Sequence, residues 1–453
     1  MGSPASPASS DASPPDADAD ADAMNAQTSS PGPKARLRAK TPLAVAFVLA
    51  GSAASAALAA IANWIAANGL GAEGFGLFSL AMAITTVLQE IGGPALDTAV
   101  VRFAGPLIKH DPRRAEVFLR AGARIKLLVS GTLAAILILS ADFLASAVFD
   151  EPALAPLIYW MSLNLLAANV STNTLARLQS SERFAAHSAF RILANGIKVL
   201  LLVGLLVTSQ LTPSAAAFAW ALSFVLTYIA GVLFCRAWRI DPQPQPGDHP
   251  HHDIFGFGGW VMLTGLLFAV HIRTDMLLLG HFGTPSEVGN YAVAWNMMLL
   301  LDLITSSLVL ALMPKAARAT SAEQLASLRK TTLMTAGGTA VALLPLYIFA
   351  EPLIHLLFRA FPDAVAPFRM LFWSSIIVLL FYPLYLCFYA KNQPAKVSAV
   401  YGVLAVSGIV AGFALIPTHG LMGAAATTLI ARIAGAVAIL MLLAFDRPKR
   451  VGI

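Results

Sequence analysis

The sequence has few charged residues and almost no cysteine. Asp, Glu, Lys and Arg make up 12% of its 453 residues, and two residues are Cys. Cys235 and Cys387 lie far apart in apolar segments, which excludes a disulfide framework and a CxxC motif. With 57% hydrophobic residues, the chain has more apolar side chain than a soluble domain can bury, so a soluble protein is excluded. The apolar runs are continuous rather than alternating, which excludes an outer-membrane barrel and predicts an all-α integral membrane protein.

Motifs for catalysis, nucleotide binding and metal binding are also missing. The sequence has no Walker loop, no Ser/His/Asp set and no paired metal site. Its one histidine cluster, His249-Pro-His251-His252, has no acidic or Cys partner at ligand spacing, and we interpret it as part of a solvated linker. We therefore expect a protein that is not an enzyme, with no metal and no cofactor.

Charge divides the chain into a tail and a membrane part. Residues 1–33 contain five Asp and no Lys or Arg, so the net charge of +6 becomes +11 for the remainder. A tail with so little to bury is predicted to be disordered. The predicted organisation is a disordered cytoplasmic tail with a basic flank (1–40), an N-terminal six-helix lobe (41–236), a cytoplasmic linker (237–254), a C-terminal six-helix lobe (255–445) and a basic cytoplasmic tail (446–453).

Twelve membrane spans are predicted from the apolar runs. They are 43–67, 75–100, 120–142, 153–176, 184–208, 213–236, 255–281, 288–313, 327–349, 365–390, 396–416 and 420–444. Loops rich in Lys and Arg alternate with loops that almost lack them: 25 of the 30 Lys and Arg residues lie on one side, and the loops on the other side hold only Arg359. Because Lys and Arg are enriched in cytoplasmic loops, both termini are predicted to be cytoplasmic.

An internal repeat relates the two halves. The segment from Gly71 to Ala81 and the segment from Gly283 to Ala294 each follow a long span, turn through a Gly-rich loop and continue with a Gly-x-aromatic-small pattern. The offset from Gly76 to Gly289 is 213 residues. Since each half has six spans, both halves cross in the same direction, which predicts two lobes related by an axis along the membrane normal.

Polar residues inside the spans are the candidates to line a cleft between the lobes. A charge within a membrane span costs about 2.5 kcal/mol or more, so it indicates function by default. Gly92-Gly93-Pro94 should kink or break the second span among several of these residues. The alternative for the cations is that they extend to the membrane surface. The candidates are Asn63, Glu90, Asp97, Arg102, Lys198, Arg273, Asp275, Asp302 and Arg432.

Several motifs resemble those of bacterial polysaccharide flippases, the O-antigen and exopolysaccharide translocases. That family belongs to a superfamily with the multidrug and toxic compound extrusion antiporters and the lipid II flippase. The motifs are Leu70-Gly-Ala-Glu-Gly-Phe-Gly-Leu-Phe-Ser-Leu-Ala81, Glu90-Ile-Gly92, Val101-Arg102-Phe103, Leu178-Gln179, Glu182-Arg183-Phe184, Asp275-Met-Leu-Leu-Leu-Gly280, Val288-Gly289-Asn-Tyr291 and Gly420-Leu-Met-Gly-Ala-Ala425. Their order and spacing cover residues 40–445.

The resemblance implies a transporter of the bacterial inner membrane that flips an undecaprenyl-diphosphate-linked oligosaccharide to the outer leaflet, for lipopolysaccharide or exopolysaccharide. It implies membrane lipids and polymerase or export proteins as partners, and no nucleic acid. On this interpretation Arg273 and Arg102, then Arg432 and Lys198, bind the diphosphate, and Asn63 faces sugar. The ion-coupling candidates are Glu90, Asp97, Asp275 and Asp302.

Three other functions stay open. A cation-coupled multidrug exporter of the same superfamily also needs acidic residues in the cleft. A polymerase, ligase or glycosyltransferase for the same lipid-linked sugars would use the longest outer loop, which carries His355, Arg359 and Asp363. A purely structural partner in an export complex is disfavoured, because a scaffold gains little from intramembrane charges.

Overall fold

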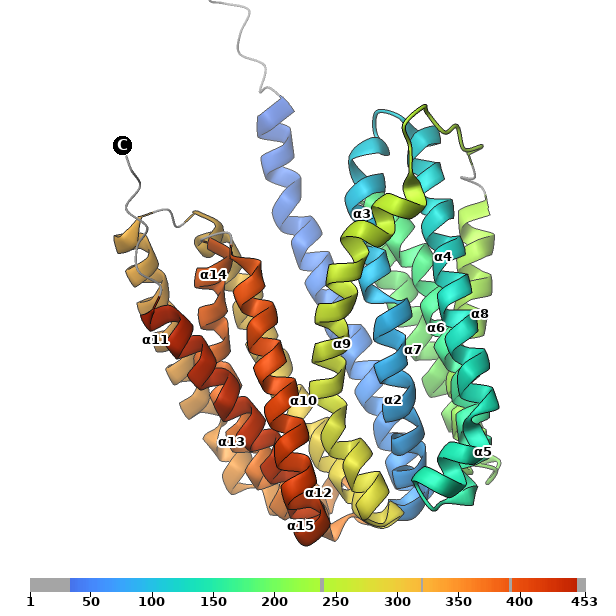
Figure 1. Cartoon of the computed structure of the whole chain (residues 1–453), viewed down its shortest axis with the longest axis vertical. Helices are drawn as coiled ribbons and strands as arrows, with labels where there is room; N and C mark the ends of the chain where they lie inside the picture. The colour runs from blue at the N-terminus through green and yellow to red at the C-terminus, as the bar shows by residue number, and fades with distance from the viewer. Residues whose placement is uncertain (1–32, 237–239, 319–320, 391–392, 446–453) are drawn as a thin grey trace, which may run out of the picture. The chain divides into compact units, whose positions relative to one another are not determined.

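The computed structural model describes residues 33–236, 240–318, 321–390 and 393–445, and every regular element in these residues is a helix (Figure 1). The chain forms two compact units, Met1–Ala50 and Gly51–Ile453. The predicted tails fall outside the described residues, except that the first long helix begins at Pro33.

The helices of 14 residues or more account for most of the described chain. They are α2 (Pro33–Gly92), α3 (Pro94–Leu107), α4 (Pro112–Leu139), α6 (Ala155–Ser180), α7 (Phe184–Val207), α8 (Pro213–Arg236), α9 (Pro250–Phe282), α10 (Pro285–Arg318), α11 (Ala322–Ile348), α13 (Val365–Phe381) and α15 (Pro394–Ala444). The short elements are α5 (Ala141–Phe143), η1 (Leu144–Val148), η2 (Pro152–Leu154), α12 (Ala350–Leu357), η3 (Pro362–Ala364), η4 (Tyr382–Tyr385) and α14 (Leu386–Ala390).

Ten helical stretches in the described residues are long and apolar enough to cross a membrane. Two of them, Ala50–Leu107 and Ala395–Ala444, have 58 and 50 residues, more than twice the roughly 20 residues that a bilayer requires. Each is interrupted by a glycine with positive φ, Gly71 at +70° and Gly420 at +49°. Glycine adopts this backbone conformation at little cost, whereas other residues do not. Dividing the two stretches at these glycines turns ten into the twelve predicted spans, and the protein is a multi-pass membrane protein.

The predicted break at Gly92-Gly93-Pro94 is confirmed. The helix α2 ends at Gly92 and α3 starts at Pro94, with Gly93 in a non-helical conformation. A Cβ atom at Gly93 would lie 2.6 Å from Oδ1 of Asn169 on α6, and one at Gly92 would lie 2.6 Å from Oγ of Ser130 on α4. The break therefore lets α2 and α3 pack closely on two neighbouring helices.

Local sequence explains where several helices begin. Proline occupies the first position of α4, α9, α10 and α15, where its missing N–H costs no helical hydrogen bond. The Asp111 side chain accepts a hydrogen bond from the Arg114 backbone N–H and caps α4. Ser321 and Gln324 form a capping box at the start of α11.

One large apolar core joins helices from both halves of the sequence. It includes Phe75 and Phe78 on α2, Trp220 on α8 and Tyr291 on α10, all of them buried. The rings of Phe78 and Trp220 pack edge to face at 5.3 Å. Leucines such as Leu128 and Leu200 are exposed instead, as expected for side chains that face lipid.

Candidate functional site

A cavity of about 870 Å³ lies among α2, α9, α10, α13, η4 and α15. Its walls are mostly apolar, and its polar side chains include Asn63, His271, Asp302, Tyr382 and Arg432. A concave apolar cavity with a few convergent polar groups is the usual form of a ligand site. We therefore take it as the candidate site.

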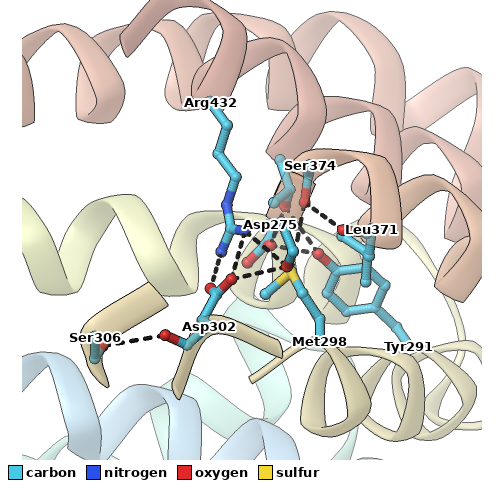
Figure 2. Close-up of polar contacts among 10 residues, drawn as sticks. Asp275, Tyr291, Met298, Asp302, Ser306, Leu371, Ser374 and Arg432 are labelled. Carbon is cyan, nitrogen blue, oxygen red and sulfur yellow. Dashed lines mark hydrogen bonds and ion pairs between the residues drawn. The ribbon is translucent and has the colours of Figure 1, made fainter. Parts of the chain in front are cut away.

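The strongest polar feature of the cavity is an ion pair between α15 and α10. In Figure 2, Arg432 reaches across to Asp302. Nη2 of Arg432 lies 2.6 Å from Oδ2 of Asp302, and Nη1 lies 3.2 Å from Oδ1. Ser375 Oγ on α13 donates to Oδ1 at 2.8 Å. The Arg432 and Asp302 side chains are 5% and 22% exposed, so this is a nearly buried pair of the bidentate kind.

A second hydrogen-bond network surrounds a carboxylate on α9. It meets α15 at Thr428, one helical turn before Arg432. Asp275 of α9 is 2% exposed, and its Oδ2 accepts a hydrogen bond from Thr428 Oγ1 at 2.5 Å and another from the Tyr291 hydroxyl. Its Oδ1 accepts the Met276 backbone N–H at 2.7 Å. Thr428 and Arg432 are four residues apart and share a helix face, so α15 contacts both Asp275 and Asp302.

Arg273, the cation favoured from the sequence, does not line the cavity. It is half-buried on α9, and its Nε has no hydrogen-bond partner within the described part of the chain. His271, two residues earlier, does line the cavity, and its Nδ1 is likewise buried without a partner there. The α9 helix therefore presents His271, rather than Arg273, to the cavity.

The other two predicted cations also lie outside the cavity. Arg102 is exposed, and its guanidinium carbon stands 4.1 Å from the ring centroid of Phe257. Lys198 is buried, with Nζ 4.0 Å from the ring centroid of Trp220 and a hydrogen bond of 3.2 Å to Asn195 Oδ1. Both positions are cation–π arrangements.

The remaining predicted residues divide between the cavity and the N-terminal helices. Asn63 lines the cavity, while its Nδ2 donates to the Ala59 carbonyl one turn back. Glu90 is half-buried and faces Gly265 of α9, where a Cβ atom would lie 3.2 Å from its Oε2. Asp97 is paired with Lys126, and neither lines the cavity.

Lys126 is the charged residue that the sequence interpretation missed. Lys126 lies inside the predicted span 120–142 but is not among the nine candidates, and in the structure it lies mid-helix in α4. It is 1% exposed, and its Nζ also donates to Thr172 Oγ1 at 2.7 Å. Its place inside the predicted span 120–142 is the sequence signal that could have identified it. The i, i+4 spacing of Thr428 and Arg432 was also present there as a signal.

Residues 65–360 match the sequence model of a family described as polysaccharide biosynthesis protein. Among solved structures, the chain is similar to a lipid II flippase, MurJ, in an inward closed conformation, with a TM-score of 0.73, 13% identity, and 88% of this chain and 87% of the other covered. It is also similar to an inward-facing multidrug resistance MATE family transporter of the MOP superfamily, with a TM-score of 0.68, 18% identity and coverages of 85% and 93%. An outward-facing MATE family transporter aligns with a TM-score of 0.59 at 16% identity, with 88% of this chain and 93% of the other covered. No curated protein matches the sequence. At these identities the structural matches establish the fold.

Proposed function

Because this chain belongs to the polysaccharide biosynthesis protein family, we propose that it flips an undecaprenyl-diphosphate-linked oligosaccharide from the cytoplasmic to the outer leaflet. The resemblance of the sequence to polysaccharide flippases is thereby confirmed at the level of the family and the transporter fold. The substrate, the inner-membrane location and the cytoplasmic termini belong to the proposal. So does the division into lobes 41–236 and 255–445, between which the substrate would pass by alternating access.

The observation that carries this proposal is the Arg432–Asp302 pair on the cavity wall. The planar fork of Arg binds a carboxylate or a phosphate group in the same bidentate manner. A diphosphate in the cavity would therefore compete with Asp302 for Arg432. Binding would release Asp302, which would then take up a proton or a sodium ion. One pair thus links a predicted head-group cation to a predicted coupling carboxylate.

The cavity walls match the rest of such a substrate. Ile61 and Trp64 on α2 and Leu300 and Leu303 on α10 line the cavity and are also exposed. A polyprenyl chain could lie along this apolar, lipid-facing part of the wall while the polar head stays inside. Asn63 and aromatic residues in the cavity supply hydrogen bonds and ring faces for sugars.

Asp275 is the second coupling candidate that the geometry supports. Its hydrogen bond to Thr428 connects it to the helix that carries Arg432. Asp275→Asn should abolish the dependence of flipping on the coupling ion, and Thr428→Val should weaken it. Flipping with an unchanged ion dependence in Asp275→Asn would remove Asp275 from the mechanism. Glu90 and Asp97 stay coupling candidates with less support, because within the described residues no hydrogen bond joins either of them to α15, the helix that carries Arg432.

The function is tested by deleting the gene and measuring lipid-linked oligosaccharide by mass spectrometry. Accessibility to a glycosidase added to spheroplasts reports the leaflet. Complete repeat units trapped on the cytoplasmic leaflet would support the proposal, and units that reach the outer leaflet normally would refute it. Complementation then separates the cations: we expect Arg432→Ala to fail and Arg432→Lys to rescue partly. Export lost in Arg273→Ala but kept in Arg432→Ala would instead place the head group at Arg273.

A cation-coupled multidrug exporter is the second candidate, because the cavity is largely apolar and holds a carboxylate. The drug-resistance profile of the deletion strain separates it from the flippase. The enzyme alternative has less support, since the similar structures are described as flippases and transporters. Substituting His355, Arg359 and Asp363 tests it, because loss of polymer synthesis with flipping intact would revive it.

A further inference from the structure

Two glycines, Gly76 on α2 and Gly289 on α10, each lie directly against the backbone of the other half. A Cβ atom at Gly76 would lie 1.8 Å from the Pro285 carbonyl oxygen, and one at Gly289 would lie 1.9 Å from the Ala72 carbonyl oxygen. These are backbone atoms, so no change of side-chain rotamer can relieve the clash. The two segments can approach this closely only because both positions are glycine.

The two contacts are reciprocal in the numbering of the internal repeat. Gly76 and Gly289 are separated by 213 residues, and so are Ala72 and Pro285. Gly76 packs on Pro285. Its equivalent in the second half, Gly289, packs on Ala72, which is the equivalent of Pro285 in the first half. Such reciprocity is the mark of an interface on a two-fold axis, here a pseudo-axis within one chain.

Other contacts between the halves lie on the same side of the fold as the Gly71 turn. Trp64 Nε1 and Asn68 Nδ2 both donate to the Leu357 carbonyl at 2.9 Å, joining α2 to the end of α12. The rings of Phe75 and Phe361 meet edge to face at 5.9 Å. The loop charges predict this side to be the outer one.

We propose that the Gly76–Pro285 and Gly289–Ala72 contacts form an outer closure of the cavity, and that the halves separate here when the cavity opens outward. Phe75, which lines the cavity, directly precedes Gly76 in the sequence. The glycine contacts use no charged side chain, so separating them leaves no buried charge without a partner. The closure is independent of which substrate the cavity holds, and so goes beyond the proposed function.

Labelling from outside tests the closure without any substrate. The reporter is Ala67→Cys, which lines the cavity and is 1% exposed, in a chain with Cys235→Ala and Cys387→Ala. In spheroplasts, we expect Gly289→Ala to raise the rate of labelling by a membrane-impermeant maleimide at least tenfold. The matched control is Gly131→Ala on α4, where a Cβ atom meets nothing within 4 Å. A folded Gly289→Ala that labels no faster than this control would overturn the proposal.

Cross-linking tests the same closure while leaving the glycine contacts intact. It is the deciding test of the closure if Gly289→Ala does not fold. Glu73 and Ser286 are exposed, lie beside Ala72 and Pro285, and are also 213 residues apart. A short bismaleimide between Glu73→Cys and Ser286→Cys should stop flipping in liposomes, whereas either single substitution with the same reagent should not. Normal flipping by the cross-linked protein would overturn the proposal. If the uncross-linked protein flips nothing, the proposed function fails, and the labelling result still decides the closure.

Discussion

Removing Asp302 should destabilise the protein more than removing the entire Arg432–Asp302 pair. Asp302→Ala leaves the Arg432 guanidinium, 5% exposed, without its carboxylate. Breaking a buried pair by deleting one partner costs about 3 to 5 kcal/mol, whereas replacing both partners by apolar residues is often neutral. Because Asp302 is 22% exposed at the cavity wall, we expect the loss of stability to lie at the lower end of this range, about 3 kcal/mol. This loss corresponds to a change of over a hundredfold in the folding equilibrium constant.

The assay is thermal unfolding of the purified protein in detergent, with three variants compared. Asp302→Ala should melt well below the wild type, and the double variant Asp302→Leu/Arg432→Met should melt close to it while losing transport. The matched control is the exposed pair Arg369–Glu351, with side chains 41% and 57% exposed at 3.4 Å. There, Arg369→Ala should cost less than about 1 kcal/mol. If Asp302→Ala melts like the wild type, or like the double variant, the argument from the buried pair is wrong.

Three further predictions concern other parts of the fold. Lys126→Met should lower the melting temperature unless Asp97→Leu accompanies it, because the single change leaves a carboxylate unpaired within the helices. Gly71→Ala should cost about 1 to 3 kcal/mol, because φ of +70° with ψ of −179° is a backbone conformation that essentially only glycine adopts, while the added Cβ atom itself meets nothing within 4 Å; an unchanged stability would contradict this turn. The Arg114 guanidinium, hydrogen-bonded to Asp248 in the linker, holds the pKa of that carboxyl below its usual value. A depressed pKa stabilises the linker contact above the unfolded pKa of about 4 and loses this contribution as pH falls through the folded pKa. Limited proteolysis of the linker should therefore stay slow at neutral pH and accelerate in acid, whereas Arg114→Ala should accelerate it at neutral pH.

The internal repeat shows how far sequence reasoning reaches. The offset of 213 residues came from a handful of Gly and aromatic matches, and the same offset relates the reciprocal contacts of Gly76 and Gly289. The break at Gly92-Gly93-Pro94 and the turn at Gly71 could likewise be predicted from the sequence, because they depend on the backbone conformations that glycine and proline can adopt. Structural features that depend on only a few neighbouring residues can be predicted from the sequence.

The candidate site was predicted only as a set of residues. Nine polar candidates were named, and the cavity includes three of them: Asn63, Asp302 and Arg432. Arg273 was favoured because it lies deep in a span, yet His271 on the same helix lines the cavity instead. Two residues along a helix rotate a side chain by about 200°, so the depth of a residue in the membrane says nothing about which way it faces.

The sequence by itself determined the membrane class, the twelve spans, the repeat and the family, because hydropathy, helix-breaking residues and short motifs are local properties of the chain. Only the tertiary structure decided which charges meet. Asp302 pairs with Arg432 across 130 residues of sequence, and Asp97 pairs with Lys126 from a neighbouring helix. Such pairs depend on the rotation of each helix about its axis and on the choice of neighbouring helices. Both are set by the packing of the whole fold rather than by any one segment.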